Sequence, residues 1–202
     1  MVIELVVATR NRHKPREIRH ILGPEFRLYD LGAHHEVSEI RESGTSFKEN
    51  AKLKALAASS QLPALVIADD SGLEVDALGG APGIYSTRYA GANATDTDKI
   101  NKLLRELARV SATEDGRRAR FRCVVALARN GNLLGTFEGI VEGSIADEAR
   151  GDSGFGYDPI FIPEGLKQTF GELPAEVKNT ISHRAKAIRA LADRLRRLEF
   201  GD

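Results

Sequence analysis

The sequence predicts an α/β protein with a mixed β-sheet flanked by helices. Apolar runs typical of buried strands alternate along the chain with segments of helical periodicity. Two strand-like runs, 119–128 and 133–141, are separated by Asn130-Gly131-Asn132, which predicts a hairpin. A sheet that combines a hairpin with helical crossovers contains both antiparallel and parallel pairs.

The first sixty residues contain two predicted strands and two predicted helices. Val2 to Ala8 is a β-branched run typical of a buried strand, and 26–31 is a second strand. Between them we expect a helix with Pro15 in its first turn, which ends at Gly23-Pro24. Ser46-Phe47-Lys48-Glu49 has capping-box spacing, so we expect a second helix, rich in Ala, Leu and Lys, after it.

The remaining elements alternate in the same way. Leu62 to Ala68 is an apolar strand, and Asp69-Asp70-Ser71-Gly72 after it is predicted to be a polar turn. Residues 96–110 form a capped amphipathic helix. A glycine-rich loop, 151–163, leads into a short strand, and Ser182 is predicted to cap the last helix.

Composition excludes several classes of protein. Of the 202 residues 42% are apolar and 29% charged, which is enough to build a core, and the net charge is zero, which disfavours a nucleic-acid partner. The single cysteine, Cys123, cannot form an internal disulfide or a cysteine-ligated zinc site. No apolar stretch is long enough to cross a bilayer and no basic leader precedes the first strand, so we expect a cytoplasmic protein without a membrane partner.

Polar residues follow two of the predicted strands. Thr9-Arg10-Asn11-Arg12-His13-Lys14 lies where ligands bind in α/β sheets, and a helix N-terminus with added cations suits a phosphate group. The simpler alternative is an ordinary helix-capping turn. Asp69 and Asp70 are costly after an apolar strand unless a cation meets them, so this pair could hold Mg²⁺ or orient water. The alternative there is an Asx turn with Gly72 at positive φ.

Two later segments add a loop that could bind a planar ring and two cationic side chains at the start of a helix. Gly154-Phe155-Gly156-Tyr157-Asp158-Pro159 combines close backbone approach with two stacking faces, although both aromatic rings could equally fill the core. His183 and Arg184 would lie in the first turn of the last helix, where the helix dipole disfavours cations unless an anion is nearby. Groups that bind phosphate, metal and a planar ring together predict a nucleotide ligand. Motifs of P-loop NTPases, zinc proteases and α/β-hydrolases are absent.

Five stretches, in this order, resemble the inosine triphosphate pyrophosphatase family, the Ham1-like (RdgB-like) pyrophosphatases of noncanonical purine nucleoside triphosphates. They are residues 9–14, Gly44 to Ala51, Ala68 to Gly72 with 79–83, Gly154 to Pro159, and Ser182-His183-Arg184. The resemblance covers nearly the whole chain. It implies hydrolysis of ITP, dITP and XTP to the monophosphate and pyrophosphate with Mg²⁺, which removes deaminated purines from the nucleotide pool. It also implies one domain, 1–202, with two lobes of an elongated mixed sheet around a central cleft, and a homodimer.

The resemblance also implies roles for individual residues. Asp70 is the implied catalytic acid, and Glu42 and Asp70 are the implied metal ligands, with Glu39 as a neighbouring alternative to Glu42. The implied substrate-binding residues are Thr9, Arg10, Asn11, Arg12, His13, Lys14, Ser71, Phe155, Gly156, Tyr157, Asp158, Lys178, His183 and Arg184.

Two other functions remain open at this point. One is a Maf-like pyrophosphatase of modified pyrimidine nucleotides, which the segments 155–158 and 182–184 disfavour. The other is a nucleic-acid-binding module that uses Arg117, Arg118, Arg120 and Arg122, which the neutral net charge and the Asp69-Asp70 pair disfavour.

Overall fold

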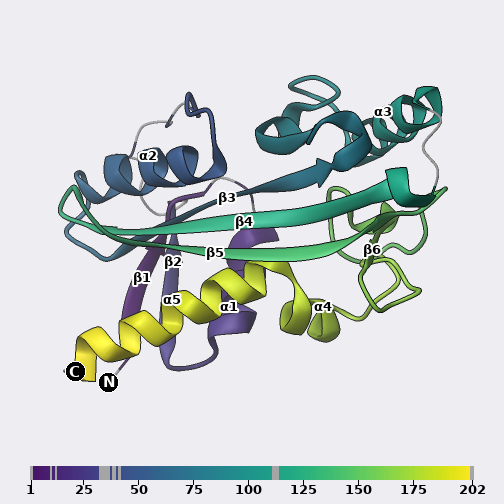
Figure 1. Ribbon diagram of the computed structural model, residues 1–202. Helices are drawn as coiled ribbons and strands as arrows, with labels where there is room; N and C mark the ends of the chain where they lie inside the picture. Colours follow the sequence, from purple (N-terminus) through teal and green to yellow (C-terminus); the bar gives the residue numbers. More distant parts are fainter. Residues whose placement is uncertain are drawn as a thin grey trace. The chain divides into compact units, whose positions relative to one another are not determined.

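The computed structural model in Figure 1 describes residues 2–9, 11, 13–31, 37, 40, 42–110 and 114–200. The strands of these residues are β1 (Ile3–Val7), β2 (Phe26–Asp30), β3 (Val66–Val75), β4 (Arg118–Arg129), β5 (Asn132–Ile145) and β6 (Phe161–Pro163). The α-helices are α1 (His13–Leu22), α2 (Phe47–Ser59), α3 (Asp96–Arg109), α4 (Ala175–Ile181) and α5 (His183–Phe200). Short 3₁₀ turns span Asp76–Leu78, Gly83–Arg88, Glu114–Arg117 and Asp158–Ile160.

The strands form one six-stranded sheet in the order β2-β1-β3-β4-β5-β6. β1 pairs in parallel with both β2 and β3, whereas β5 pairs antiparallel with β6. β4 and β5 are joined at Asn130 and Gly131, whose φ angles of 50° and 72° are those that a two-residue hairpin turn requires. The predicted α/β fold with a mixed sheet and flanking helices is therefore confirmed.

The chain divides into two compact units. Unit 1 comprises Met1–Asp70, Cys123–Gly139 and His183–Asp202, and unit 2 comprises Ser71–Arg122 and Ile140–Ser182. The single domain with two lobes that the resemblance implies stays a prediction.

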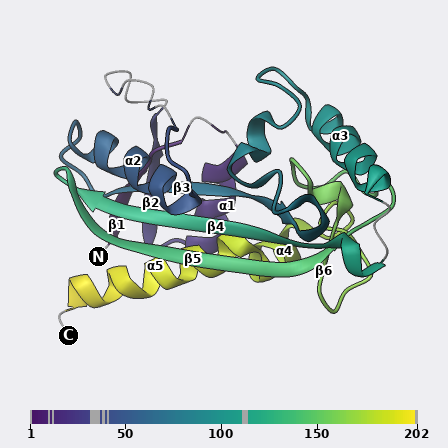
Figure 2. The same ribbon diagram turned by 45° about the horizontal axis from the view of Figure 1, so that its top comes forward.

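Unit 1 has helices on both faces of its strands. Figures 1 and 2 show α1 and α5 on one face and α2 on the other. Side chains alternate along β1, so that Leu5 and Val7 join a core with Ile18 of α1 and Leu191 of α5. The buried residues of α2 include three alanines, Ala51, Ala55 and Ala58, beside the polar side chains of Asn50 and Lys54. For the same reason, polar side chains of two consecutive strand residues point to opposite faces of the sheet.

Unit 2 has a separate core rich in aromatic residues. Leu103 and Leu107 of α3 pack in the same cluster as Leu73 of β3. The rings of Phe121 and Phe161 lie 4.6 Å apart between centroids. Tyr157 of the glycine-rich loop is buried in this core, so one of the two aromatic residues predicted to stack on a ligand contributes to packing.

The structure corrects one predicted element outright. β3 begins at Val66, not at Leu62, and runs through Asp69-Asp70-Ser71-Gly72, where a polar turn is predicted. Gly72 is not among the glycines at positive φ, so the Asx-turn alternative is wrong as well. The segment is extended within the sheet, where β3 lies between β1 and β4, and both carboxylates have cationic partners, which a turn composition cannot reveal.

One helix start differs in detail from prediction, and one helix was not predicted. Ser46 accepts the Glu49 N–H bond expected of an N-cap, but the Glu49 carboxylate accepts from Thr45 and not from Ser46. Helix α4 is not predicted from the sequence at all. Ser182 has extended backbone directly before α5, as the predicted cap position requires.

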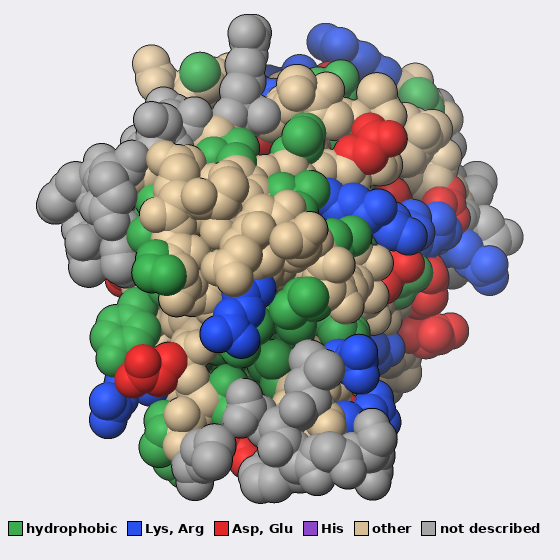
Figure 3. All heavy atoms as spheres, turned by 90° about the vertical axis from the view of Figure 1, so that its left-hand side faces the viewer, with side chains coloured by type: hydrophobic (Ala, Val, Ile, Leu, Met, Phe, Trp, Pro, Cys, Tyr) green, Lys and Arg blue, Asp and Glu red, His purple; other side chains and the backbone are tan. Residues whose placement is uncertain are grey.

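The surface carries charges of both signs. On the face drawn in Figure 3, Lys and Arg side chains alternate with Asp and Glu side chains, and neither sign dominates the described residues in view. No helix in the described part of the chain has the length and apolar character needed to cross a membrane.

Candidate functional site

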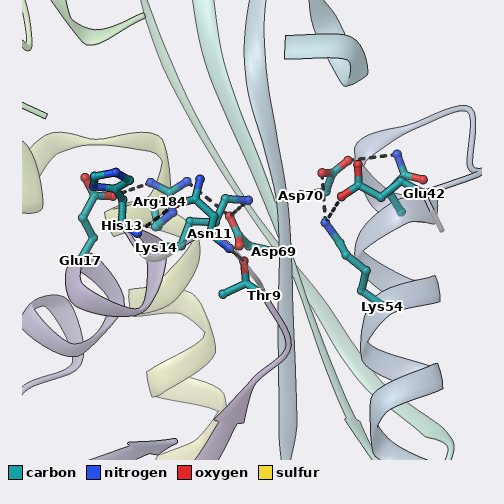
Figure 4. A network of polar contacts seen from close by, with 11 residues as sticks. Thr9, Asn11, His13, Lys14, Glu17, Glu42, Lys54, Asp69, Asp70 and Arg184 are labelled. Atoms are coloured by element: carbon teal, nitrogen blue, oxygen red, sulfur yellow. Dashed lines mark hydrogen bonds and ion pairs between the residues drawn. The ribbon is translucent and has the colours of Figure 1, made fainter. Parts of the chain in front are cut away.

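Asp69 and Asp70 are the centre of the polar cluster in unit 1 (Figure 4). They are consecutive residues of β3, so their side chains point to opposite faces of the strand. Asp69 Oδ2 lies 3.0 Å from Lys14 Nζ, and Asp70 Oδ1 lies 3.2 Å from Lys54 Nζ. Both carboxylates are nearly inaccessible to solvent. A single step along the strand therefore creates two charge centres with separate partners.

The Asp69 centre is a buried network of four charges. Arg184 at the start of α5 places Nη2 3.3 Å from Asp69 Oδ2 and pairs through Nη1 with Glu17 of α1. Burial alone would raise the pKa of Asp69, but Lys14 and Arg184 outweigh burial and hold the pKa well below its ordinary value. The pKa of Arg184 is raised by the same carboxylates, against the effect of burial. Two cations and two anions thus balance.

Local hydrogen bonds fix the position of Lys14. The Asn11 N–H donates to Thr9 Oγ1 over 3.2 Å, and Asn11 Oδ1 accepts the His13 N–H over 2.9 Å, which caps the start of α1. Lys14 is the second residue of that helix and its side chain is buried. Arg10 and Arg12, the other predicted phosphate ligands of this segment, lie outside the described residues.

The Asp70 centre is built from α2. Asn50 and Lys54 are four residues apart on that helix and therefore share one face. Asn50 donates from Nδ2 to Asp70 Oδ2 over 3.1 Å and accepts the Gly44 N–H over 2.8 Å. A Cβ atom at position 44 would lie 2.8 Å from Asn50 Oδ1, so a glycine is needed there. The segment before α2 is thereby tied to β3 through one buried amide.

Glu42 completes this centre. Its Oε1 accepts from Lys54 Nζ over 2.8 Å, so Glu42 and Asp70 approach the same ammonium group. Burial raises the pKa of Asp70 above its ordinary value against the opposing charge of Lys54, and Glu42 raises it further. Burial opposes the charge on Lys54, but its carboxylate neighbours raise its pKa.

These two carboxylates suit a hard cation. Oxygen ligands that already gather round one positive charge fit the chemistry of Mg²⁺. Within the described ranges, no group of three or more His, Cys, Asp or Glu is placed to hold a metal ion. Glu39, the alternative to Glu42, lies outside those ranges. The metal role of Glu42 and Asp70 stays a prediction.

Unit 2 carries the glycine-rich loop. The Phe155 N–H donates to Asp158 Oδ2 over 2.7 Å, and Lys178 Nζ of α4 lies 2.5 Å from the same oxygen. Lys178 Nζ is also 4.8 Å from the centroid of the Phe155 ring. The Tyr157 hydroxyl donates to the carbonyl of Ser86 over 3.0 Å. The predicted residues Phe155, Asp158 and Lys178 are thus brought into one cluster.

The residues that complete the polar centres around Asp69 and Asp70 were not predicted from the sequence. Lys54 and Asn50 carry a signal that was available: polar residues on the alanine-rich face of an expected helix. Glu17 carries none, because its partner Arg184 is 167 residues away. His183 is buried at the start of α5, and Ser71 is half-buried on β3 directly after Asp70.

The site residues lie within a region shared with known proteins. A family model described as the Ham1 family matches residues 5–194. The chain belongs to the Ham1 family. Its curated relatives include proteins named dITP/XTP pyrophosphatase. That of Desulforamulus reducens is 47% identical over 197 residues, 97% of each chain, and that of Bacillus subtilis is 47% identical over 192 residues, covering 94% of this chain and 95% of its own.

Solved structures of the Ham1 family share the fold. A HAM1 protein from Coxiella burnetii matches with a TM-score of 0.87 and 41% identity, over 96% of this chain and 99% of its own. The Staphylococcus aureus Ham1 protein matches with a TM-score of 0.84 and 42% identity, over 96% and 98%. The fold and family predicted by resemblance are therefore confirmed along nearly the whole chain.

Proposed function

We propose that this chain is a Mg²⁺-dependent nucleoside triphosphate pyrophosphatase that hydrolyses dITP, ITP and XTP to the monophosphate and pyrophosphate. The observation that carries the proposal is the pair of neighbouring carboxylates on β3. Asp69 forms an ion pair with Lys14, and Asp70 forms one with Lys54, which Glu42 also contacts. The substrate class is supported by membership of the Ham1 family and by relatives named dITP/XTP pyrophosphatase.

Lys14 is the proposed cation for the triphosphate. Its ammonium group is held at Asp69, and a bound polyphosphate would share that charge with the carboxylate. Arg184 keeps Asp69 ionised and in place. Lys14 is therefore oriented before substrate arrives, which lowers the entropy lost on binding.

Asp70 is the proposed general base. In hydrolysis to a monophosphate, water attacks the α-phosphorus, the water proton passes to a base, and pyrophosphate leaves. Asp70 is buried and its two oxygens are held by Lys54 and Asn50, so its carboxylate is fixed in position to accept that proton. Glu42 and Asp70 would hold Mg²⁺, which neutralises charge developing on phosphate oxygens when bound.

The loop of unit 2 is the proposed reader of the purine base. Phe155 offers a ring face beside the cation of Lys178, and Asp158 fixes both groups. The implied role of Arg184 in substrate binding stays a prediction, and its guanidinium pairs with Asp69 and Glu17 here. The predicted homodimer and the predicted lack of a nucleic-acid partner stay predictions as well.

The test is a pyrophosphate-release assay with dITP, XTP, ITP, GTP, ATP and CTP, with and without Mg²⁺. We expect pyrophosphate from dITP, XTP and ITP, much less from the other three, and loss of activity on chelation. A preference for pyrimidine nucleotides would favour the Maf-like alternative. Release of orthophosphate, or no turnover of any purine, would contradict the proposal.

A further inference from the structure

A carboxylate outside every motif of the sequence holds the centre of the glycine-rich loop. Asp96 is the first residue of α3 and lies 60 residues before the loop in sequence. Its Oδ2 accepts the N–H of Gly156 over 2.6 Å. Its Oδ1 lies 2.6 Å from Nζ of Lys99, one helical turn further along α3. Both oxygens of this carboxylate are therefore held in place.

The contact falls at the point where the loop has least support of its own. Phe155 and Asp158 are tied to each other by a hydrogen bond, and Tyr157 is anchored on Ser86 and in the core. Gly156 lies between the two aromatic residues at a φ of +65°, and a Cβ there would meet no atom within 4 Å. Packing therefore does not restrain Gly156 on its Cβ side, and its N–H is held by the bond to Asp96.

Lys99 makes the arrangement rigid. Its side chain is only 11% exposed, whereas that of Asp96 is 46% exposed. A buried ammonium needs a charged partner, so the ion pair with Lys99 holds the Asp96 carboxylate in its place. A hydrogen bond from a backbone N–H to an ionised carboxylate is stronger than one to a neutral acceptor. Two residues of α3, Asp96 and Lys99, therefore hold the backbone of the loop at Gly156.

We propose that Asp96, oriented by Lys99, is a positioning residue that sets the affinity for the purine base by holding Gly156 and, through it, the Phe155 ring. The inference rests on the proposed function, in which this loop binds the base. Asp96 touches no substrate in this account. Its effect is on the entropy lost when the loop orders around the base, and it therefore belongs to substrate binding and not to the chemical step.

The test compares three variants of the full chain with dITP as substrate. Asp96→Ala removes the acceptor and is expected to raise KM roughly tenfold while kcat stays within about twofold. Asp96→Asn keeps an oxygen acceptor for Gly156 but loses the ion pair with Lys99, so a smaller rise in KM, about threefold, is expected. The matched control is Asp98→Ala, which removes the Thr95 capping box of the same helix but no loop contact, and should leave KM unchanged.

The outcomes separate the possible failures. An unchanged KM in Asp96→Ala, an equal rise in Asp98→Ala, or no rescue by Asp96→Asn would overturn the positioning role. Wild-type protein without turnover of dITP or XTP would overturn the proposed function instead. If Asp96→Ala does not fold, Asp96→Glu takes its place with the same expected rise, because it keeps the charge at the helix start but displaces the acceptor.

Discussion

Two neighbouring carboxylates, Asp69 and Asp70, have pKa values shifted in opposite directions. Asp69 and Asp70 differ by one position on β3, and strand geometry sends them to opposite faces. Asp69 meets two cations, Lys14 and Arg184, and its pKa falls. Asp70 meets one ammonium that it shares with Glu42, so burial prevails and its pKa rises. The first is suited to organising charge and the second to accepting a proton.

Asp70→Asn is expected to lower kcat by roughly 10²–10⁴-fold, because the amide has nearly the same shape but cannot take a proton from water. Lys54 keeps Glu42 as a partner, so the fold should persist. The measurement is the rate of pyrophosphate release at saturating Mg²⁺, with a urea unfolding curve for each protein. A variant that retains more than about a tenth of the wild-type rate would remove Asp70 from the role of base.

Arg184→Ala is expected to destabilise the protein by about 3–5 kcal/mol, because the buried carboxylate of Asp69 and the partly buried one of Glu17 would each lose a cationic partner. Arg196→Ala on the same helix is the matched control. Its guanidinium pairs with Glu25 at the surface and is 44% exposed, so the loss should stay below about 1 kcal/mol. Urea unfolding measures both. Equal losses in the two variants would mean that the buried network contributes nothing special.

At the scale of elements, prediction worked where periodicity was regular. The strands around 3–7 and 118–145 and the helix 96–109 follow from apolar spacing and turn chemistry alone. It failed at Asp69-Asp70-Ser71-Gly72, a composition typical of a turn, because distant cations stabilise the extended chain there. It also missed α4, a seven-residue helix with one buried residue, which has no apolar face to detect.

Cys123 on β4 can be used to measure how readily this strand becomes accessible to solvent. Cys123 is the chain's only cysteine and is fully buried in this strand, and burial raises the pKa of its thiol to about 12. The thiolate is the reactive form, so both burial and the raised pKa protect this sulfur in the native protein. A thiol reagent should therefore react at least roughly 100-fold more slowly with native protein than with protein in urea. Comparable rates would show that β4 opens readily.

For the molecule as a whole, the family could be predicted from short motifs, but the long-range contacts between polar side chains of the site could not. Asp69 and Arg184 are 115 residues apart, and Asp96 and Gly156 are 60 apart. No spacing rule links such pairs, because only the fold brings them together. The resemblance implied residues for substrate and metal binding, and those roles stay predictions. It assigned no role to Glu17, Asn50, Lys54 or Asp96, which bond to other residues of the protein.

In the proposed reaction, water attacks the α-phosphorus of a deaminated purine nucleotide, and the bond between the α- and β-phosphates breaks. Hydrolysis of dITP in water enriched in ¹⁸O tests it directly, with mass spectrometry of both products. The account predicts one ¹⁸O atom in the monophosphate and none in the pyrophosphate. Label in the pyrophosphate, or label in released orthophosphate, would contradict it.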